Sequence, residues 1–154
     1  MIADLKQILL AEDNANDVEL TLNALRGNHI VNEIVVVRDG VEALDYLYRR
    51  NTFAQRAGTN PALVLLDLKM PKVDGIEVLR QIKSDSALKS IPVVMLTSSR
   101  EEQDLVRSYE LGVNAYVVKP VAFHEFIDAV KLLGGFWAVI NEPPPHRPQG
   151  PPRG

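Results

Sequence analysis

The sequence of 154 residues predicts a doubly wound α/β fold, a three-layer sandwich in which helices cover both faces of a parallel sheet. Five short aliphatic runs that do not alternate with polar residues are typical of strands buried on both faces. Amphipathic stretches separate the runs, and five strand–helix repeats imply right-handed crossovers and therefore parallel strands. The runs are Ile8–Ala11, Ile34–Val37, Ala62–Leu66, Val93–Leu96 and Ala115–Val118.

Helix signals lie in each stretch between and after these runs. The first helix is expected to open at Asn16, because Glu19 three residues later completes an N-cap signature. The fourth is expected over about residues 101–111 and to end at Gly112, since glycine readily adopts the left-handed backbone that terminates helices. The other helices are expected after Asp39-Gly40, after Asp74-Gly75 and after Pro120, and residues 51–61 are expected to form a long loop.

The last expected helix has apolar residues on two sides. Leu132 points away from its core stripe, and Phe136 lies near Leu132 if the helix continues. Such residues are either scattered apolar residues of an ordinary surface or an association surface. We favour a homodimer built on the fourth helix, the fifth strand and the fifth helix. The core stripe is Phe123, Phe126, Ile127, Val130 and Leu133, and the candidate dimer residues are Leu132, Phe136, Trp137 and Ile140.

The C-terminal segment differs in composition from the rest. Residues 141–154 carry six of the ten prolines and no large apolar residue. Proline cannot join a helix interior or a central strand, so an extended tail is expected there. Residues 1–140 are expected to form one domain, and a chain of this length leaves no room for an output domain beside it.

Composition narrows the class of function. The chain has no cysteine, which excludes disulfides and thiolate metal sites and fits a cytoplasmic protein. The net charge of -3 does not support nucleic-acid binding, which needs a clustered basic face. No apolar run is long enough for a signal peptide or a membrane span.

Polar residues of complementary chemistry follow four of the five runs. In an open parallel sheet, ligands bind beyond the carboxyl ends of the strands, where the strand order reverses. If the first and third strands are neighbours, three carboxylates converge, with a hydroxyl and an ammonium group on the other side of the pocket. These strand-end residues are Glu12-Asp13, Asp67, Thr97-Ser98 and Lys119-Pro120.

This combination of groups suits phosphoryl chemistry. Three close carboxylates raise one another's pKa unless a cation compensates, and Mg²⁺ is a hard cation that binds carboxylates while it keeps waters. A phosphoryl group on one carboxylate would give Lys119 and Thr97 an anion to hold. Each residue alone is weak evidence, because acids after strands are usually helix caps or solvated loop residues.

The motifs Glu12-Asp13, Asp67 to Gly75, Thr97-Ser98-Ser99 and Lys119-Pro120 resemble those of receiver domains of two-component response regulators. The resemblance spans about residues 6–133. It implies a flavodoxin-like (βα)5 fold with strand order 2-1-3-4-5 and phosphorylation of Asp67 by a histidine kinase. It also implies Mg²⁺ bound by Asp13, Asp67 and the Lys69 backbone carbonyl, with Glu12 acting through a water.

The resemblance further implies a conformational switch. Thr97 and Tyr116 would form the switch pair, in which the hydroxyl turns toward the phosphoryl group and the ring turns inward. Lys69 and Ser99 would flank the path of attacking water, and the Lys119–Pro120 bond would commonly be cis.

A narrower resemblance is to the single-domain regulators that serve phytochrome-type light-sensing kinases. Residues 38–47, Phe136-Trp137, residues 141–144 and the loop 51–61 carry it. The expected function is therefore a stand-alone response regulator with a phytochrome-type kinase as partner. It would catalyse its own phosphorylation and dephosphorylation but would not turn over a free metabolite.

Other functions fit the same residues less well. A magnesium-dependent phosphatase with an aspartyl nucleophile needs an acid two residues after it, and that position is Lys69. A flavin- or nucleotide-binding doubly wound domain is disfavoured because Glu12-Asp13 would repel a phosphate and no glycine-rich fingerprint occurs there. A receiver-like scaffold that acts by protein contact without phosphorylation remains the alternative.

Overall fold

The structure is a computed structural model that describes residues 6–28, 30–113 and 115–133. One parallel sheet has the order β2-β1-β3-β4-β5, which confirms the expected fold class. The expected contributions of Phe136, Trp137 and Ile140, and the expected tail, lie outside the described residues. The strands are β1 (Ile8–Ala11), β2 (Ile34–Val37), β3 (Leu63–Asp67), β4 (Val93–Thr97) and β5 (Tyr116–Val118).

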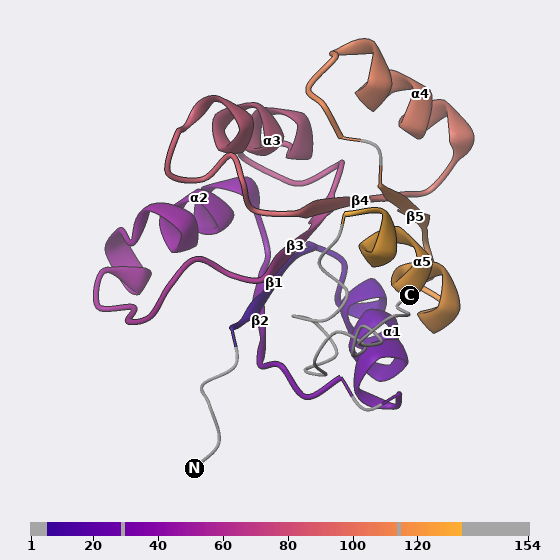
Figure 1. Ribbon diagram of the computed structural model, residues 1–154, viewed down its shortest axis with the longest axis horizontal. Helices are drawn as coiled ribbons and strands as arrows, with labels where there is room; N and C mark the ends of the chain where they lie inside the picture. The colour runs from indigo at the N-terminus through magenta and orange to yellow at the C-terminus, as the bar shows by residue number, and fades with distance from the viewer. Residues whose placement is uncertain (1–5, 29, 114, 134–154) are drawn as a thin grey trace, which may run out of the picture.

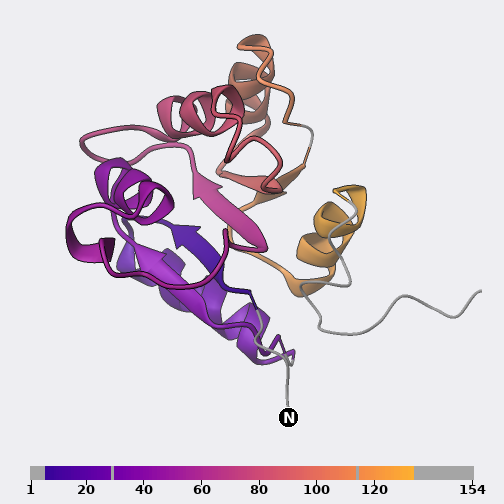
Figure 2. The same cartoon turned by 60° about the vertical axis from the view of Figure 1, so that its left-hand side comes forward.

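Helices cover both faces of the sheet (Figures 1 and 2), with α1 and α5 on one face and α2, α3 and α4 on the other. Successive strand residues point to opposite faces, so Leu9 packs with the α2 and α3 side chains while Leu10 packs with those of α1 and α5. None of the described helices is long and apolar enough to cross a membrane. The helices are α1 (Ala15–Arg26), α2 (Gly40–Tyr48), α3 (Gly75–Ser84), α4 (Arg100–Ser108) and α5 (Phe123–Leu132), with the short 3-10 helix η1 (Asn51–Phe53).

The strand order places the polar residues at one edge of the sheet. β1 lies between β2 and β3, so the order of the strands reverses beside β1 and β3. Ala11 lies opposite Leu66, and Asp67 lies opposite Leu96. The residues that follow β1, β4 and β5 therefore meet Asp67 at the carboxyl ends of the strands, where ligands bind in such sheets.

The expected start of the first helix was wrong by two residues. Asn14, not Asn16, is the N-cap of α1, and its side chain accepts a hydrogen bond from the Asp17 N–H at 2.9 Å. This start places Asp17 in the first turn of the helix, at the edge of the site. The expected starts of α2 and α3 are confirmed, since Asp39 and Asp74 cap them.

The expected end of the fourth helix was also wrong. α4 ends at Ser108 rather than near Gly112, and Glu110 has a left-handed backbone with φ of 53°. Turn hydrogen bonds from the backbone N–H groups of Tyr109 and Glu110 close the helix before the glycine is reached. Gly112 does adopt a positive φ, 84°, but within the loop that follows.

The last helix follows the expected pattern in part. Phe126 and Val130 are buried, and Phe123, Ile127 and Leu133 pack against the same cluster. Ala129 is also buried in it, a residue that the apolar stripe did not include. Leu132 points away and is 69% exposed.

Candidate functional site

Three carboxyl groups meet at the carboxyl end of the sheet. Oxygen atoms of Glu12, Asp13 and Asp67 lie within 4.8 Å of one another. Glu12 and Asp67 are buried and Asp13 is exposed. The adjacency of β1 and β3 thus brings together the acids that the sequence suggested would converge.

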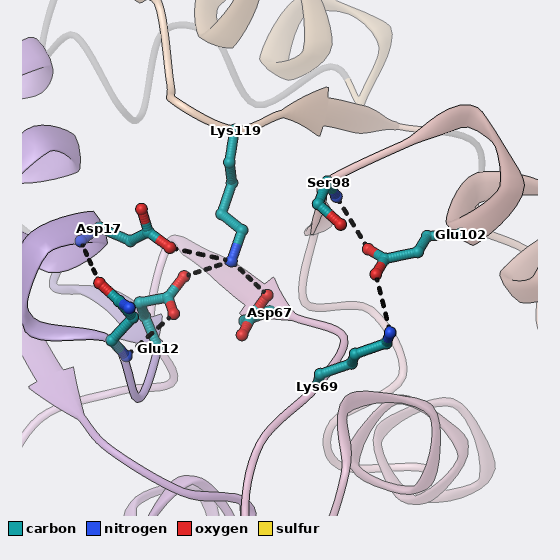
Figure 3. Close-up of polar contacts among 8 residues, drawn as sticks. Glu12, Asp17, Asp67, Lys69, Ser98, Glu102 and Lys119 are labelled. Atoms are coloured by element: carbon teal, nitrogen blue, oxygen red, sulfur yellow. Dashed lines mark hydrogen bonds and ion pairs between the residues drawn. The ribbon is translucent and has the colours of Figure 1, made fainter.

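Lys119 lies against this cluster (Figure 3) and binds three carboxylates. Its Nζ lies 2.9 Å from Asp67 Oδ1, 3.2 Å from Glu12 Oε1 and 3.3 Å from Asp17 Oδ2. The ammonium group donates hydrogen bonds to Asp67 and Glu12, and its contact with Asp17 is an ion pair. The Lys119–Pro120 peptide bond is cis, as the family resemblance implied.

The electrostatics of the cluster favour an additional cation. Burial, followed by the nearby Asp67 charge, raises the pKa of Glu12 to about 7. Burial also raises the pKa of Asp67, although Lys119 opposes this shift. Burial alone would lower the pKa of Lys119, but its contacts with Asp67 and Glu12 raise it above the usual value. The carboxylates therefore stabilise the charged form of Lys119, while burial still disfavours the charged forms of Glu12 and Asp67.

The donor set fits a divalent metal ion. Three carboxyl groups, those of Glu12, Asp17 and Asp67, share the ammonium group of Lys119, and Asp13 adds a fourth carboxyl group to the described part of the site. All of these acids offer oxygen ligands, which hard cations such as Mg²⁺ prefer. Burial is the main cause of the raised pKa of Glu12 and Asp67, and a neighbouring carboxylate adds to each shift, so a bound cation would favour the ionised form of both groups.

The expected switch residues lie on neighbouring strands. Thr97 ends β4 and is fully buried, and its Oγ1 accepts a hydrogen bond from Gln103 Nε2 at 3.5 Å. Tyr116 lies on β5, is partly exposed, and donates its hydroxyl proton to the Val113 carbonyl at 3.1 Å. The Arg107 guanidinium lies 4.6 Å from the centre of the Tyr116 ring.

A second charged contact connects the loop after β3 with the start of α4 (Figure 3). Glu102 Oε1 accepts a hydrogen bond from the Ser98 N–H at 2.8 Å, and its Oε2 lies 3.5 Å from Lys69 Nζ. Burial acts to raise the pKa of Glu102, but the contacts with Ser98 and Lys69 outweigh it and the net shift is downward. Ser99 caps α4 by accepting from the Glu102 N–H.

Tight packing fixes the strand end that carries Asp67. The Gly75 N–H, at the start of α3, donates to the Leu68 carbonyl at 2.8 Å. A Cβ atom on Gly75 would lie 2.2 Å from the backbone oxygen of Asp67, so only glycine fits. The seven residues between Asp67 and Gly75 therefore form a closed loop, and Lys69 lies within it.

Sequence reasoning missed three residues of the site. Asp17, Glu102 and Gln103 contact Lys119, Ser98 and Thr97, respectively. All three lie in the first turn of a helix that begins just after a strand end. The loops that precede α1 and α4 are both short, so the first turn of each helix lies at the same edge of the sheet as the strand ends. Loop length is therefore the sequence signal that could have identified these three residues.

Comparison with known proteins agrees with this geometry. Residues 8–131 match the response regulator receiver domain family. Response regulator Rcp1 of Synechocystis sp. is 40% identical over 132 residues, which cover 86% of this chain and 88% of Rcp1. A crystal structure of the Mn²⁺-bound form of Rcp1 covers 92% of this chain and 99% of that chain, with 38% identity and a TM-score of 0.68.

Two further solved structures are similar. The bacteriophytochrome response regulator AtBRR has 62% identity and a TM-score of 0.86, and the match covers 91% of this chain and all of that one. The phosphorylated cyanobacterial phytochrome response regulator RcpA has 44% identity and a TM-score of 0.69, with 86% of this chain and 94% of that chain covered. The site and these similarities agree, and the chain belongs to the response regulator receiver domain family.

Proposed function

We propose that this protein is a response regulator that accepts a phosphoryl group on Asp67 from a histidine kinase. The observation that carries the proposal is the buried Asp67 carboxylate, 2.9 Å from Lys119 Nζ and grouped with Glu12 and Asp13. An isolated carboxylate is a weak nucleophile. The surrounding charges are suited to stabilise the anion that forms when Asp67 attacks.

The proposed reaction transfers one phosphoryl group. A carboxylate oxygen of Asp67 forms a bond to phosphorus as the bond between phosphorus and the kinase imidazole nitrogen breaks. Lys119 stays protonated and pairs with a phosphoryl oxygen, and the Thr97 hydroxyl donates a hydrogen bond to another. Attack by water on the acyl phosphate later releases inorganic phosphate and restores the carboxylate.

Magnesium is the proposed cofactor. Asp13, Asp67 and the backbone carbonyl of Lys69 would hold the ion directly, and Glu12 would hold it through a water. When bound, Mg²⁺ would neutralise charge on the phosphoryl oxygens. The oxygen donors of the cluster and its unbalanced negative charge support this assignment.

A phytochrome-type photoreceptor kinase is the proposed donor. The similarity to AtBRR and RcpA, both described as phytochrome response regulators, supports this partner. We place the reaction in the cytoplasm. The alternative is a scaffold that acts by contact alone, but the convergence of Glu12, Asp67 and Lys119 favours phosphorylation, because contact alone needs no such cluster.

The proposed output is a change in the surface formed by α4, β5 and α5. Thr97 and Tyr116 would couple that surface to the phosphoryl group, since they lie on adjacent strands. We also propose that this surface mediates a homodimer and that the protein does not bind nucleic acid directly. Each of the three elements carries an exposed large apolar side chain, which supports an interface: Leu105 on α4, Val118 on β5 and Leu132 on α5.

Substitution of Asp67 tests the site. Asp67→Asn preserves the shape of the side chain but removes the nucleophilic carboxylate, so we expect no labelling by a phosphohistidine donor in Mg²⁺. The control is Asp128→Asn, which removes an exposed carboxylate from α5 and should label like the wild type. Undiminished labelling of Asp67→Asn would refute the assignment.

A further inference from the structure

Glu102 ties together two loops that border the site. In Figure 3 its carboxylate lies between Ser98 and Lys69, and Asp67 lies between this group and the other two acids that bind Lys119, Glu12 and Asp17. The two oxygens of Glu102 have different partners, the Ser98 N–H at 2.8 Å and the Lys69 ammonium at 3.5 Å. Neither partner is part of the carboxylate cluster around Lys119.

Both partners of Glu102 are suited to bind an anion. A backbone N–H and an ammonium group are common donors to phosphate oxygens. Ser98 directly follows β4, whose residue Leu96 lies opposite Asp67 in the sheet. Lys69 lies two residues after Asp67. Both donors therefore belong to the segments that leave the sheet beside the proposed acceptor.

The side chains of Glu102 and Lys69 differ in exposure, which shows which of the two is fixed by its surroundings. The Glu102 side chain is 13% exposed, whereas the Lys69 side chain is 79% exposed. The Glu102 carboxylate is thus largely buried and contacts both donors, whereas the Lys69 side chain is mostly exposed to solvent and contacts Glu102 at its ammonium end. The Glu102 carboxylate thus already occupies both donors.

Glu102 also belongs to α4, which has fewer buried residues than any other of the five described α-helices. Val106 is the only buried residue of α4, and Leu105 is exposed. The Glu102 side chain and its N–H, which donates to Ser99 Oγ at 3.2 Å, both hold the first turn of α4. Because little core packing holds α4, loss of the Glu102 contacts would allow the start of this helix to move.

We propose that Glu102 is a positioning residue that competes with the phosphoryl group on Asp67 for the Ser98 N–H and the Lys69 ammonium. In the unphosphorylated protein, Glu102 holds both donors and so holds the start of α4 against the loop after β3. In the phosphorylated protein, phosphoryl oxygens take the donors and Glu102 is released. This competition rests on the proposed function, since it requires an anion on Asp67.

Titration with beryllofluoride in Mg²⁺, a phosphoryl mimic, tests the competition. Glu102→Gln keeps an acceptor for Ser98 but loses the charge that pairs with Lys69, so we expect about three- to tenfold tighter binding. Glu102→Ala should show at least the same gain and serves if the first variant folds poorly. The matched control is Glu101→Gln, an exposed acid in the same first turn, which should bind like the wild type.

A second comparison separates competition from a structural role. In a Lys69→Ala background, the gain from Glu102→Gln should fall by at least half, because one contested donor is gone. A purely structural role would instead weaken binding, whichever residue occupies position 69. If the wild type binds the mimic and Glu102→Gln binds no tighter, the competition is refuted and the proposed function stands. If the wild type does not bind it, both are refuted.

Discussion

Glu12 shows how a single buried acid can couple stability to pH. It is fully buried, and burial raises its pKa from 4.5 to about 7. The folded protein therefore keeps a proton on Glu12 over a range in which the unfolded chain has lost it. Stability must then fall as pH rises from about 4.5 to about 7, by at most about 3 kcal/mol from this residue.

This pH dependence is testable by urea unfolding of the metal-free protein. Glu12→Gln cannot ionise, so its free energy of unfolding should decline less than that of the wild type between pH 5 and pH 8. Glu19→Gln, which removes an exposed acid from α1, should keep the wild-type slope. Excess Mg²⁺ should also flatten the wild-type curve, because a bound cation favours the ionised carboxylate. Equal slopes for wild type and Glu12→Gln would contradict the prediction.

The residues at strand ends could be predicted, and those one turn into a helix could not. Glu12, Asp67 and Lys119 follow apolar runs directly, so their place at one edge of the sheet follows from parallel strands alone. The place of Asp17 depends on where α1 begins, and the sequence pattern pointed to Asn16 as the cap whereas the structure has Asn14 there. Side-chain direction in the first turn is set only after that choice is made.

At the scale of elements, α4 shows that a local sequence signal can fail to predict where a helix ends. Gly112 looked like a helix end, but the chain leaves the helix at Tyr109 and a non-glycine residue, Glu110, takes the first left-handed position. With one residue classed as buried, α4 has little apolar periodicity to define its length. Its start was better specified, because Ser99 is a strong N-cap residue.

The junction of β3 and α3 supplies a sharper prediction. In Gly75→Ala, the new Cβ would lie 2.2 Å from the Asp67 carbonyl oxygen, so the strand end or the helix must shift. Alanine in an unstrained helix would stabilise the protein, but here we expect a loss of about 1–3 kcal/mol in the free energy of unfolding. Beryllofluoride binding should weaken too, because the displaced atom belongs to Asp67.

The matched control for this junction lies at the other end of the same helix. Ser84→Ala changes an exposed residue of α3 and should alter stability by about 0.5 kcal/mol or less. Unchanged stability of Gly75→Ala in chemical denaturation would mean that the close contact relaxes without cost. Loss of stability with unchanged binding of the mimic would mean that the shift is confined to α3.

At the scale of the molecule, the layers follow from the sequence and the order of the strands follows from the family. Repeated strand–helix units require a parallel sheet with covered faces. Nothing in the residues of Ile8–Ala11 alone says that β3 rather than β4 lies beside β1. The order 2-1-3-4-5 came from the receiver resemblance. The boundary between a domain at 1–140 and a tail at 141–154 stays a prediction.

The surface of α4, β5 and α5 leads to a prediction about assembly. We expect light scattering to report a mass near twice 17.1 kDa, with or without beryllofluoride. Leu132→Glu places a charge on the most exposed large apolar residue of this surface. Burial of a leucine contributes about 1.5–3 kcal/mol, and each dimer would contain two copies. We therefore expect the dissociation constant to rise at least about tenfold.

The control is Val31→Glu, because Val31 is 59% exposed but lies between α1 and β2, away from α4 and β5. It should leave the mass unchanged. A wild type that has the mass of one chain in both states would refute the dimer. If instead Val31→Glu dissociates the protein and Leu132→Glu does not, the chains associate through the surface beside the loop between α1 and β2. The surface of α4, β5 and α5 would then be free for a different partner.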